Sequence, residues 1–141
     1  MDEKTREAYQ DWLTKWPFQW FLTIRLPSPD YSSYLNTIRN TLLRAEGGQI
    51  GYMGIFVNDS TGPHVHLVMI GRFRGRSLKD LDFNEWEMKI NEIVRDKKGC
   101  KISEIFDLSG VARYIFSNKN KTGGEFELIP PWGRIVQGRR R

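Results

Sequence analysis

Two apolar segments joined by a short polar one constrain the fold of this chain most. Residues 50–57 and 63–70 are rich in aliphatic, aromatic and β-branched side chains. The residues between them, Asn-Asp-Ser-Thr-Gly at 58–62, all favour turns. Short apolar runs bounded by turn residues are typical of strands. The pattern therefore predicts a β-hairpin of two antiparallel strands.

Other segments add helices and further strands to this hairpin. Residues 1–16 form an amphipathic lead-in with Tyr9, Trp12, Leu13 and Trp16 at roughly helical spacing. Beyond it we predict strands at residues 18–26, 100–106 and 125–129, helices at residues 31–46, 83–94 and 111–118, and a basic loop at residues 72–76.

After the lead-in, the predicted order of elements is β-α-β-β-α-β-α-β. The first six elements follow the ferredoxin-like split pattern, which is also the topology of RNA-recognition modules. We expect a single α+β domain over residues 1–141, with an antiparallel sheet of about five strands. Helices on one face of the sheet would leave the other face free for a site. Residues 138–141 are expected to form a basic tail.

The composition narrows the compartment and the partner. A chain of 141 residues suits one domain, and its net charge of +5 mildly favours a polyanionic partner. Cys100 is the single cysteine, so we expect no internal disulfide and a reducing compartment. The charged first ten residues are not typical of a signal peptide, and no apolar run approaches the roughly 20 residues of a membrane span. We expect a soluble, cytoplasmic protein.

The two histidines of the chain, His64 and His66, lie on one predicted strand with a single residue between them. Side chains alternate across a strand, so both imidazoles should point to the same face. Imidazole is the commonest protein metal ligand, and two imidazoles make half of a divalent-cation site. The alternative is a pair of exposed strand histidines that bind no metal.

Tyr114 lies on a predicted helix well after the histidines, and Lys119 and Lys121 follow it. A phenol has a pKa of about 10, so it needs a nearby cation or base to act as a nucleophile. Most tyrosines instead pack in the core or at its rim, and that interpretation stays open at this point.

Three segments together, and in this order, resemble the motifs of HUH-class (histidine–hydrophobic–histidine) endonucleases that initiate replication. Residues 21–24 (FLTI) are similar to the opening strand of that family, and residues 62–67 (GPHVHL) to its histidine strand. Residues 110–115 (GVARYI) are similar to its tyrosine-bearing helix. The resemblance covers most of the chain, from about Trp16 to Ile129, and the order of the segments is more specific than any one of them.

The resemblance implies a metal-dependent enzyme that nicks and rejoins single-stranded DNA. His64, His66 and one further ligand would hold Mg²⁺ or Mn²⁺ at the scissile phosphate. Tyr114 would attack phosphorus and form a 5′-phosphotyrosine, releasing a 3′ hydroxyl that can later rejoin the strand. The partners would be the origin DNA of a plasmid or virus and the helicase and polymerase of the host, in the host cytoplasm.

Two features depart from the family pattern. The lysine that usually follows the tyrosine by three residues is replaced by serine, so Lys119 and Lys121 are the catalytic candidates. A second alignment puts Phe116 in the nucleophile position, which would make the protein inactive. The third metal ligand is also open, because residues 51–57 contain no acid. Asp59 in the following turn is the favoured candidate, and the others are Asn58, Glu46, Gln49, Glu104 and Asp107.

Single-strand binding combines phosphate contacts with stacking on aromatic rings. The candidate phosphate-binding side chains, each of which could also be a solvated surface charge, are Arg25, Arg72, Arg74, Arg76, Lys119 and Lys121. The arginines of residues 72–76 follow the histidine strand directly and include a phenylalanine among them.

Two other classes stay open. Single-tyrosine transposases use the same histidine pair, but the FLTI opening favours a replication initiator. A non-catalytic single-strand binder of the RNA-recognition type has the same topology, although its aromatic-rich signature is missing. Cleavage with Mn²⁺ would separate the nucleases from the binder, because only a nuclease leaves a covalent DNA adduct.

Overall fold

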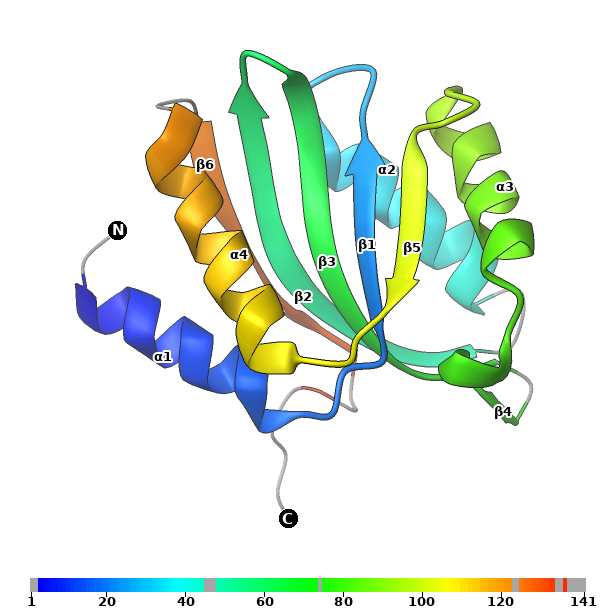
Figure 1. Cartoon of the computed structure of the whole chain (residues 1–141). Coiled ribbons are helices and arrows are strands. Elements are labelled where there is room, and N and C mark those ends of the chain that lie inside the picture. Colours follow the sequence, from blue (N-terminus) through cyan, green and yellow to red (C-terminus); the bar gives the residue numbers. More distant parts are fainter. Residues whose placement is uncertain (1–2, 45–47, 74, 123–124, 134–135, 137–141) are drawn as a thin grey trace.

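In the computed structural model, the described residues form one six-stranded antiparallel sheet with four α-helices (Figure 1). The structure describes residues 3–44, 48–73, 75–122, 125–133 and 136. The helices are α1 (Glu3–Lys15), α2 (Tyr31–Ile38), α3 (Phe83–Val94) and α4 (Leu108–Thr122). The strands are β1 (Trp20–Arg25), β2 (Gly48–Asp59), β3 (Gly62–Phe73), β4 (Arg76–Ser77), β5 (Cys100–Glu104) and β6 (Glu125–Trp132).

The sheet has the strand order β5-β1-β3-β2-β6, and the short β4 pairs with β3. Both β1 and β2 are antiparallel to β3, which lies between them, so β1 and β2 run parallel to each other. The predicted α+β class with an antiparallel sheet is confirmed. The prediction of about five strands missed β4, which is only two residues long.

The β2–β3 hairpin is the longest feature of the sheet, with 12 residues in each strand. Its turn is held by the Asp59 carboxylate, which accepts hydrogen bonds from the backbone N of Thr61 at 2.9 Å and from its hydroxyl at 2.6 Å. The prediction of a loop at residues 72–76 was wrong in part. Strand β3 extends to Phe73 because it pairs with β2 up to that residue, and Phe73 also pairs with Arg76 of β4.

Helix α2 is shorter than the predicted helix over residues 31–46. It ends at Ile38 and continues as a π-helical segment, Arg39–Arg44. Helix α3 has the predicted bounds because local signals mark both ends: the Asp82 carboxylate caps the backbone N of Asn84, and Arg95 adopts the left-handed conformation that ends helices. No helix of the described residues is long and apolar enough to cross a membrane.

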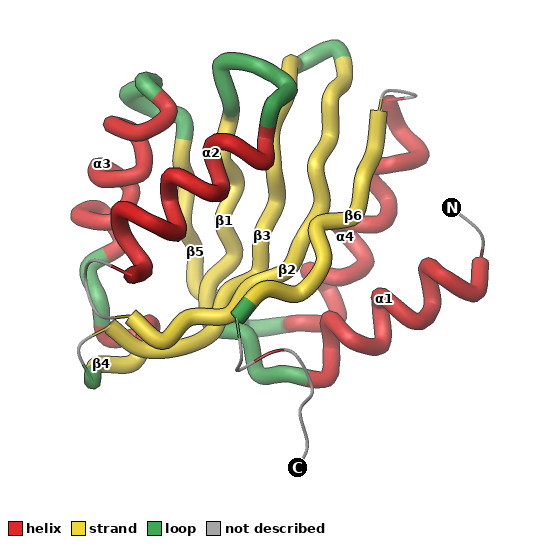
Figure 2. The backbone as a smooth tube through the Cα atoms, turned by 180° about the vertical axis from the view of Figure 1, so that it is seen from behind, coloured by secondary structure: helices red, strands yellow, loops and turns green. Residues whose placement is uncertain are grey.

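Helices cover both faces of the sheet, so the expectation of one free face was wrong. Helices α2 and α3 pack on one face, which Figure 2 shows from that side. Helices α1 and α4 pack on the other, over apolar side chains of β2 and β3: Met53, Ile55, Val57 and Val68. Strands β2 and β3 are apolar on both sides, and burying the second apolar side favours a second layer.

The second layer stops short of β1 and β5. On the α4 side of these two strands, Arg25, Lys101 and Ser103 are exposed, and Thr23 is half-buried. On the opposite side, Leu22, Ile24 and Ile102 are buried in the core under α2 and α3. The open face of β1 and β5 therefore lies directly beside β3, along the edge of α4 (Figure 1).

Candidate functional site

The histidine pair lies on β3, which has hydrogen-bonded neighbours on both sides. His64 faces Arg25 of β1 across the ladder, and His66 faces Thr23. The two imidazole centroids are 5.0 Å apart and their planes cross at 83°. Both rings therefore stand on the side of β3 that α4 covers in part, at the border of the open face.

The tautomer of His64 follows from its hydrogen bond. Its Nδ1 lies 3.0 Å from the backbone carbonyl oxygen of Gly62. A carbonyl oxygen can only accept, so Nδ1 must carry the proton. In the neutral ring the lone pair is then on Nε2, on the far side from the backbone. A carbonyl that fixes the other nitrogen in this way is the usual support of a metal-ligating histidine.

His66 is held from the β1 side. Its Nδ1 lies 3.1 Å from the hydroxyl oxygen of Thr23, and its ring stacks on Phe21 at a centroid distance of 5.7 Å. Only 3% of the residue is exposed. Burial, together with the neighbouring His64 and against the opposite effect of Asp59, lowers the pKa of His66 to about 4. The ring is therefore neutral near pH 7, which is the protonation state that a metal ligand requires.

Tyr114 approaches the histidines from α4. Its ring lies 5.7 Å from the ring of His66 and 6.0 Å from that of Phe21, with edge-to-face geometry in both cases. Ala112 and Ile115 of the same helix are buried against the sheet, whereas Tyr114 is 47% exposed. Helix packing thus places this phenol at the boundary between α4 and the open face, beside the histidines and in contact with solvent.

The position of α4 also bears on the rival nucleophile. Successive residues of an α-helix are rotated by about 100° around its axis. The backbone of residue 116 therefore lies on the side of α4 nearly opposite to that of residue 114. Position 114 is the one that faces the histidines. The backbones of Lys119 and Lys121 belong to the later part of α4, while their side chains lie outside the described residues.

The favoured third ligand, Asp59, is not gathered with the histidines. It lies two residues beyond Val57, the partner of His64 across the hairpin, and so is on the same side of β2. Its carboxylate is hydrogen-bonded to Thr61, which is the main cause that lowers the pKa of Asp59. Across the described part of the chain, no three His, Cys, Asp or Glu side chains form a group that could hold a metal. Two of the alternatives, Glu104 and Gln49, lie on β5 and near the start of β2, and Glu46 lies outside the described residues.

The structure separates the candidate phosphate-binding arginines into two groups. Arg25 is next to the site, since it pairs with His64 across the ladder; it also forms an ion pair with Asp96 at 3.3 Å. Arg72 is six residues from His66 along β3, roughly 20 Å of extended strand. Arg76 donates to the backbone carbonyl of Asp80, and Arg74 lies outside the described residues, as does the tail at residues 138–141.

Sequence reasoning missed two side chains of the site. Thr23 appeared only as part of a strand motif, yet its hydroxyl contacts His66. Lys101 of β5 pairs with Thr23 across the ladder, so an exposed ammonium group flanks the site on the open face. The sequence did contain a signal for Lys101. Side chains alternate along β5, so a lysine between the apolar Cys100 and Ile102, which are buried, should lie on the opposite, exposed side.

Comparison of the chain with protein-family models, with curated proteins and with solved structures gives no match. The chemistry of the site is therefore argued from its geometry. Two imidazoles, a half-exposed phenol and exposed cations converge on one side of the sheet, and they come from β1, β3, β5 and α4.

Proposed function

We propose that this protein is a metal-dependent endonuclease of the HUH class, which nicks and rejoins single-stranded DNA through Tyr114. One observation carries the proposal: the Tyr114 ring lies 5.7 Å from that of His66, although the two residues are far apart in the sequence. The strand order β5-β1-β3-β2 also supports it, because it is the order that the ferredoxin-like pattern requires.

His64 and His66 would hold the divalent cation, Mg²⁺ or Mn²⁺. Two observations support this metal site. The Gly62 carbonyl accepts a hydrogen bond from Nδ1 of His64, so the lone pair of the neutral ring is on Nε2, and His66 is neutral near pH 7. With Thr23 as acceptor, Nδ1 of His66 keeps its proton, so the lone pair of this neutral ring is on Nε2. When bound, the cation would polarise a phosphate oxygen and stabilise the charge that develops there. Asp59 stays the proposed third ligand, and both of its hydrogen bonds from Thr61 end on one carboxylate oxygen, Oδ1.

Tyr114 is the proposed nucleophile. Its phenolic oxygen forms a bond to phosphorus, the bond from phosphorus to the 3′ oxygen breaks, and the 5′ phosphate stays on the tyrosine. The phenol gives its proton to solvent, and the departing 3′ oxygen takes one up to become a hydroxyl. Reversal of the same step by a 3′ hydroxyl rejoins the strand, so the phosphate ester is exchanged without an external energy source.

The open face of β1 and β5 is the proposed path of the substrate. Arg25, two residues beyond Thr23 on β1, and Lys101, the partner of Thr23 on β5, offer positive charge, and Phe21 offers an aromatic ring that is only half-buried. Phosphate neutralisation combined with stacking is the usual chemistry of single-strand binding. The site is shallow and lies on a sheet face, which favours a strand that is already unpaired.

The test is covalent adduct formation. Purified protein is incubated with a library of single-stranded oligonucleotides and Mn²⁺, denatured, and analysed by mass spectrometry. We expect a protein–DNA adduct whose modified peptide contains Tyr114, and we expect no adduct from Tyr114→Phe. This change removes only the hydroxyl, so the fold is retained. His64→Ala should remove metal-dependent adduct formation as well.

The same assay addresses the second candidate class. Phe21, His66 and Tyr114 form an aromatic cluster beside the open face, and such a cluster also suits a non-catalytic binder that stacks bases. A binder would retard the oligonucleotide on a native gel without any adduct after denaturation. Full adduct formation by Tyr114→Phe would instead reject Tyr114 as the nucleophile.

A further inference from the structure

A surface pocket lies at the far end of β3 from the histidines. Its lining includes Arg72 and Ile70, which lie on the same side of β3 as His64 and His66. The other lining residues that matter for its chemistry are Gln19, Gln49, Ser77 and Lys79. We call this site the Arg72 pocket.

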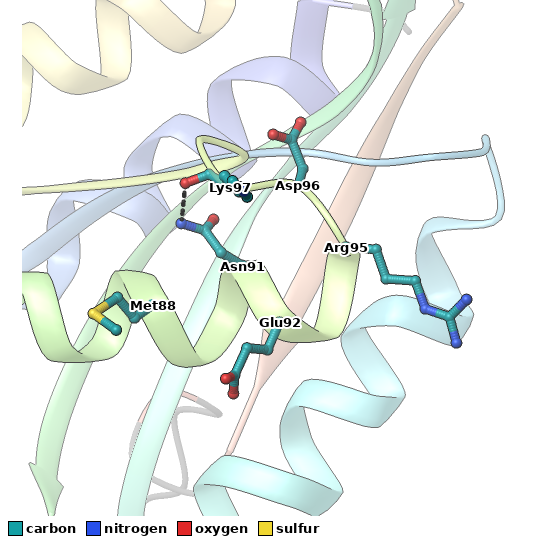
Figure 3. Close-up of a pocket in the computed structure, with 6 residues that line it drawn as sticks. All are labelled: Met88, Asn91, Glu92, Arg95, Asp96 and Lys97. Carbon is teal, nitrogen blue, oxygen red and sulfur yellow. Dashed lines mark hydrogen bonds between the residues drawn. The ribbon is translucent and has the colours of Figure 1, made fainter.

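Charge distinguishes the Arg72 pocket from two others on the surface. Arg72 and Lys79 line it with two positive charges, and no acidic residue is among its lining. A pocket at the end of α3, shown in Figure 3, is balanced, since Arg95 and Lys97 share it with Glu92 and Asp96. The third pocket is acidic, because Arg76 lines it together with Asp80, Asp82 and Glu85. An anion therefore prefers the Arg72 pocket to these two.

The floor of the Arg72 pocket is fixed by hydrogen bonds. The side chain of Gln19 accepts from the backbone N of Gly71 at 2.9 Å and donates to the hydroxyl of Ser77 at 2.5 Å. Gly71 has φ of +144°, and a Cβ at this position would lie 2.1 Å from the carbonyl oxygen of Gln49. The backbones of β2 and β3 approach closely there, so the amide side chain and the strands hold the pocket in shape without a ligand.

An exposed aromatic residue lies next to the Arg72 pocket, in the connection from β5 to α4. The connection from β5 to α4 passes β1 where the backbone N of Ile105 donates to the carbonyl of Gln19 at 3.0 Å. The next residue, Phe106, is 87% exposed. A phenylalanine ring left in solvent offers a stacking surface for a base, and stacking is tolerant of sequence.

We propose that the Arg72 pocket binds a backbone phosphate of the single strand that is cut at Tyr114, and that Phe106 stacks one of its bases. This inference rests on the proposed function for the identity of the strand. The pocket would hold the substrate at a second point, roughly 20 Å from His66. The nicked strand would then stay attached on a second surface besides the covalent bond.

The test measures binding as a function of salt. Fluorescence anisotropy follows a short and a long oligothymidine without divalent metal, so that no cleavage occurs. For a single strand the slope of log K against log salt is about 0.7 for each phosphate contact. Arg72→Gln with Lys79→Gln removes both cations that would hold the one proposed phosphate, so the slope for the long oligonucleotide should become shallower by about 0.7. The slope for the short one, which cannot reach both sites, should stay unchanged.

Two further variants control for net charge and for stacking. Arg95→Gln with Lys97→Gln removes the same two charges from the balanced pocket of Figure 3, and its slope should equal that of the wild type. Phe106→Ala should weaken binding of the long oligonucleotide by about fivefold or more with no change of slope, because a stacking contact carries no charge. All these side chains are exposed, and circular dichroism checks that the fold is intact.

The outcomes separate the two proposals. An unchanged slope in Arg72→Gln with Lys79→Gln overturns the phosphate site, and unchanged affinity in Phe106→Ala overturns the stacking contact. Adduct formation is measured independently with Mn²⁺ at saturating DNA, where the pocket variant should still react. If the wild type forms no adduct but the slope changes as expected, the pocket stands and the nicking function fails. A wild-type protein that binds neither oligonucleotide overturns both.

Discussion

Thr23→Val is the most informative single change at the histidine pair. The Thr23 hydroxyl lies 3.1 Å from Nδ1 of His66, and in the proposed enzyme it accepts a hydrogen bond from Nδ1, so that the lone pair for the metal is on Nε2. Valine has nearly the same shape and suits a strand at least as well as threonine. The variant therefore removes one hydrogen-bond partner while the packing of β1 against β3 is kept.

The size of the effect follows from the supporting role of such partners. Loss of a hydrogen bond to a metal-ligating histidine typically weakens metal affinity by about 10- to 100-fold. This equals about 1.4 to 2.7 kcal/mol in binding free energy. We expect the Mn²⁺ concentration for half-maximal adduct formation to rise by this factor. The rate at saturating Mn²⁺ should change less, because Tyr114 comes from α4 and does not depend on Thr23.

The assay combines a Mn²⁺ titration of adduct formation with direct measurement of Mn²⁺ binding by calorimetry. Thr23→Ser is the matched control, since it keeps the hydroxyl and loses only a methyl group; it should bind Mn²⁺ nearly as well as the wild type. If Thr23→Val binds Mn²⁺ as tightly as Thr23→Ser does, the hydroxyl does not orient His66, and the argument for the tautomer of this ring is refuted.

Two further predictions concern the scaffold of the site. The hydroxyl of Tyr9 on α1 contacts the backbone carbonyls of Gly54 and Ile129, so Tyr9→Phe should lower the free energy of unfolding by about 1 kcal/mol in a urea titration; an unchanged midpoint would show that this contact does not hold α1 on the sheet. Burial, with a smaller contribution from Glu87, raises the pKa of Cys100 to about 12, so the thiol stays protonated at pH 8 and should react with a thiol reagent only as the protein unfolds. Rapid modification in the absence of denaturant would contradict this.

Local patterns were sufficient for the parts of the fold that depend on neighbours in the chain. The hairpin of β2 and β3 follows from two apolar runs around a turn whose aspartate bonds to Thr61. Helix α3 was predicted with its observed bounds, because capping residues act within one turn. The shared side of His64 and His66 also needs nothing beyond the alternation of a single strand.

Patterns failed where a distant segment decides the outcome. Helix α4 was predicted shorter than it is, and the second helical layer over β2 and β3 was not expected at all. The apolar residues Met53, Ile55 and Val68 were visible in the sequence, but periodicity does not say which element will cover them. The extension of β3 through residues predicted as a loop likewise depends on pairing with β2 and β4.

The sequence by itself determined an antiparallel α+β chain with two imidazoles on one side of a strand, because strand alternation and turn formation are local properties. Only the tertiary structure decided that Tyr114 meets His66, that β1 and β5 stay uncovered next to them, and that Arg72 belongs to a separate pocket rather than to the histidines. These relations join residues from different elements. They depend on how apolar faces pack against one another, and a linear pattern does not encode that packing residue by residue.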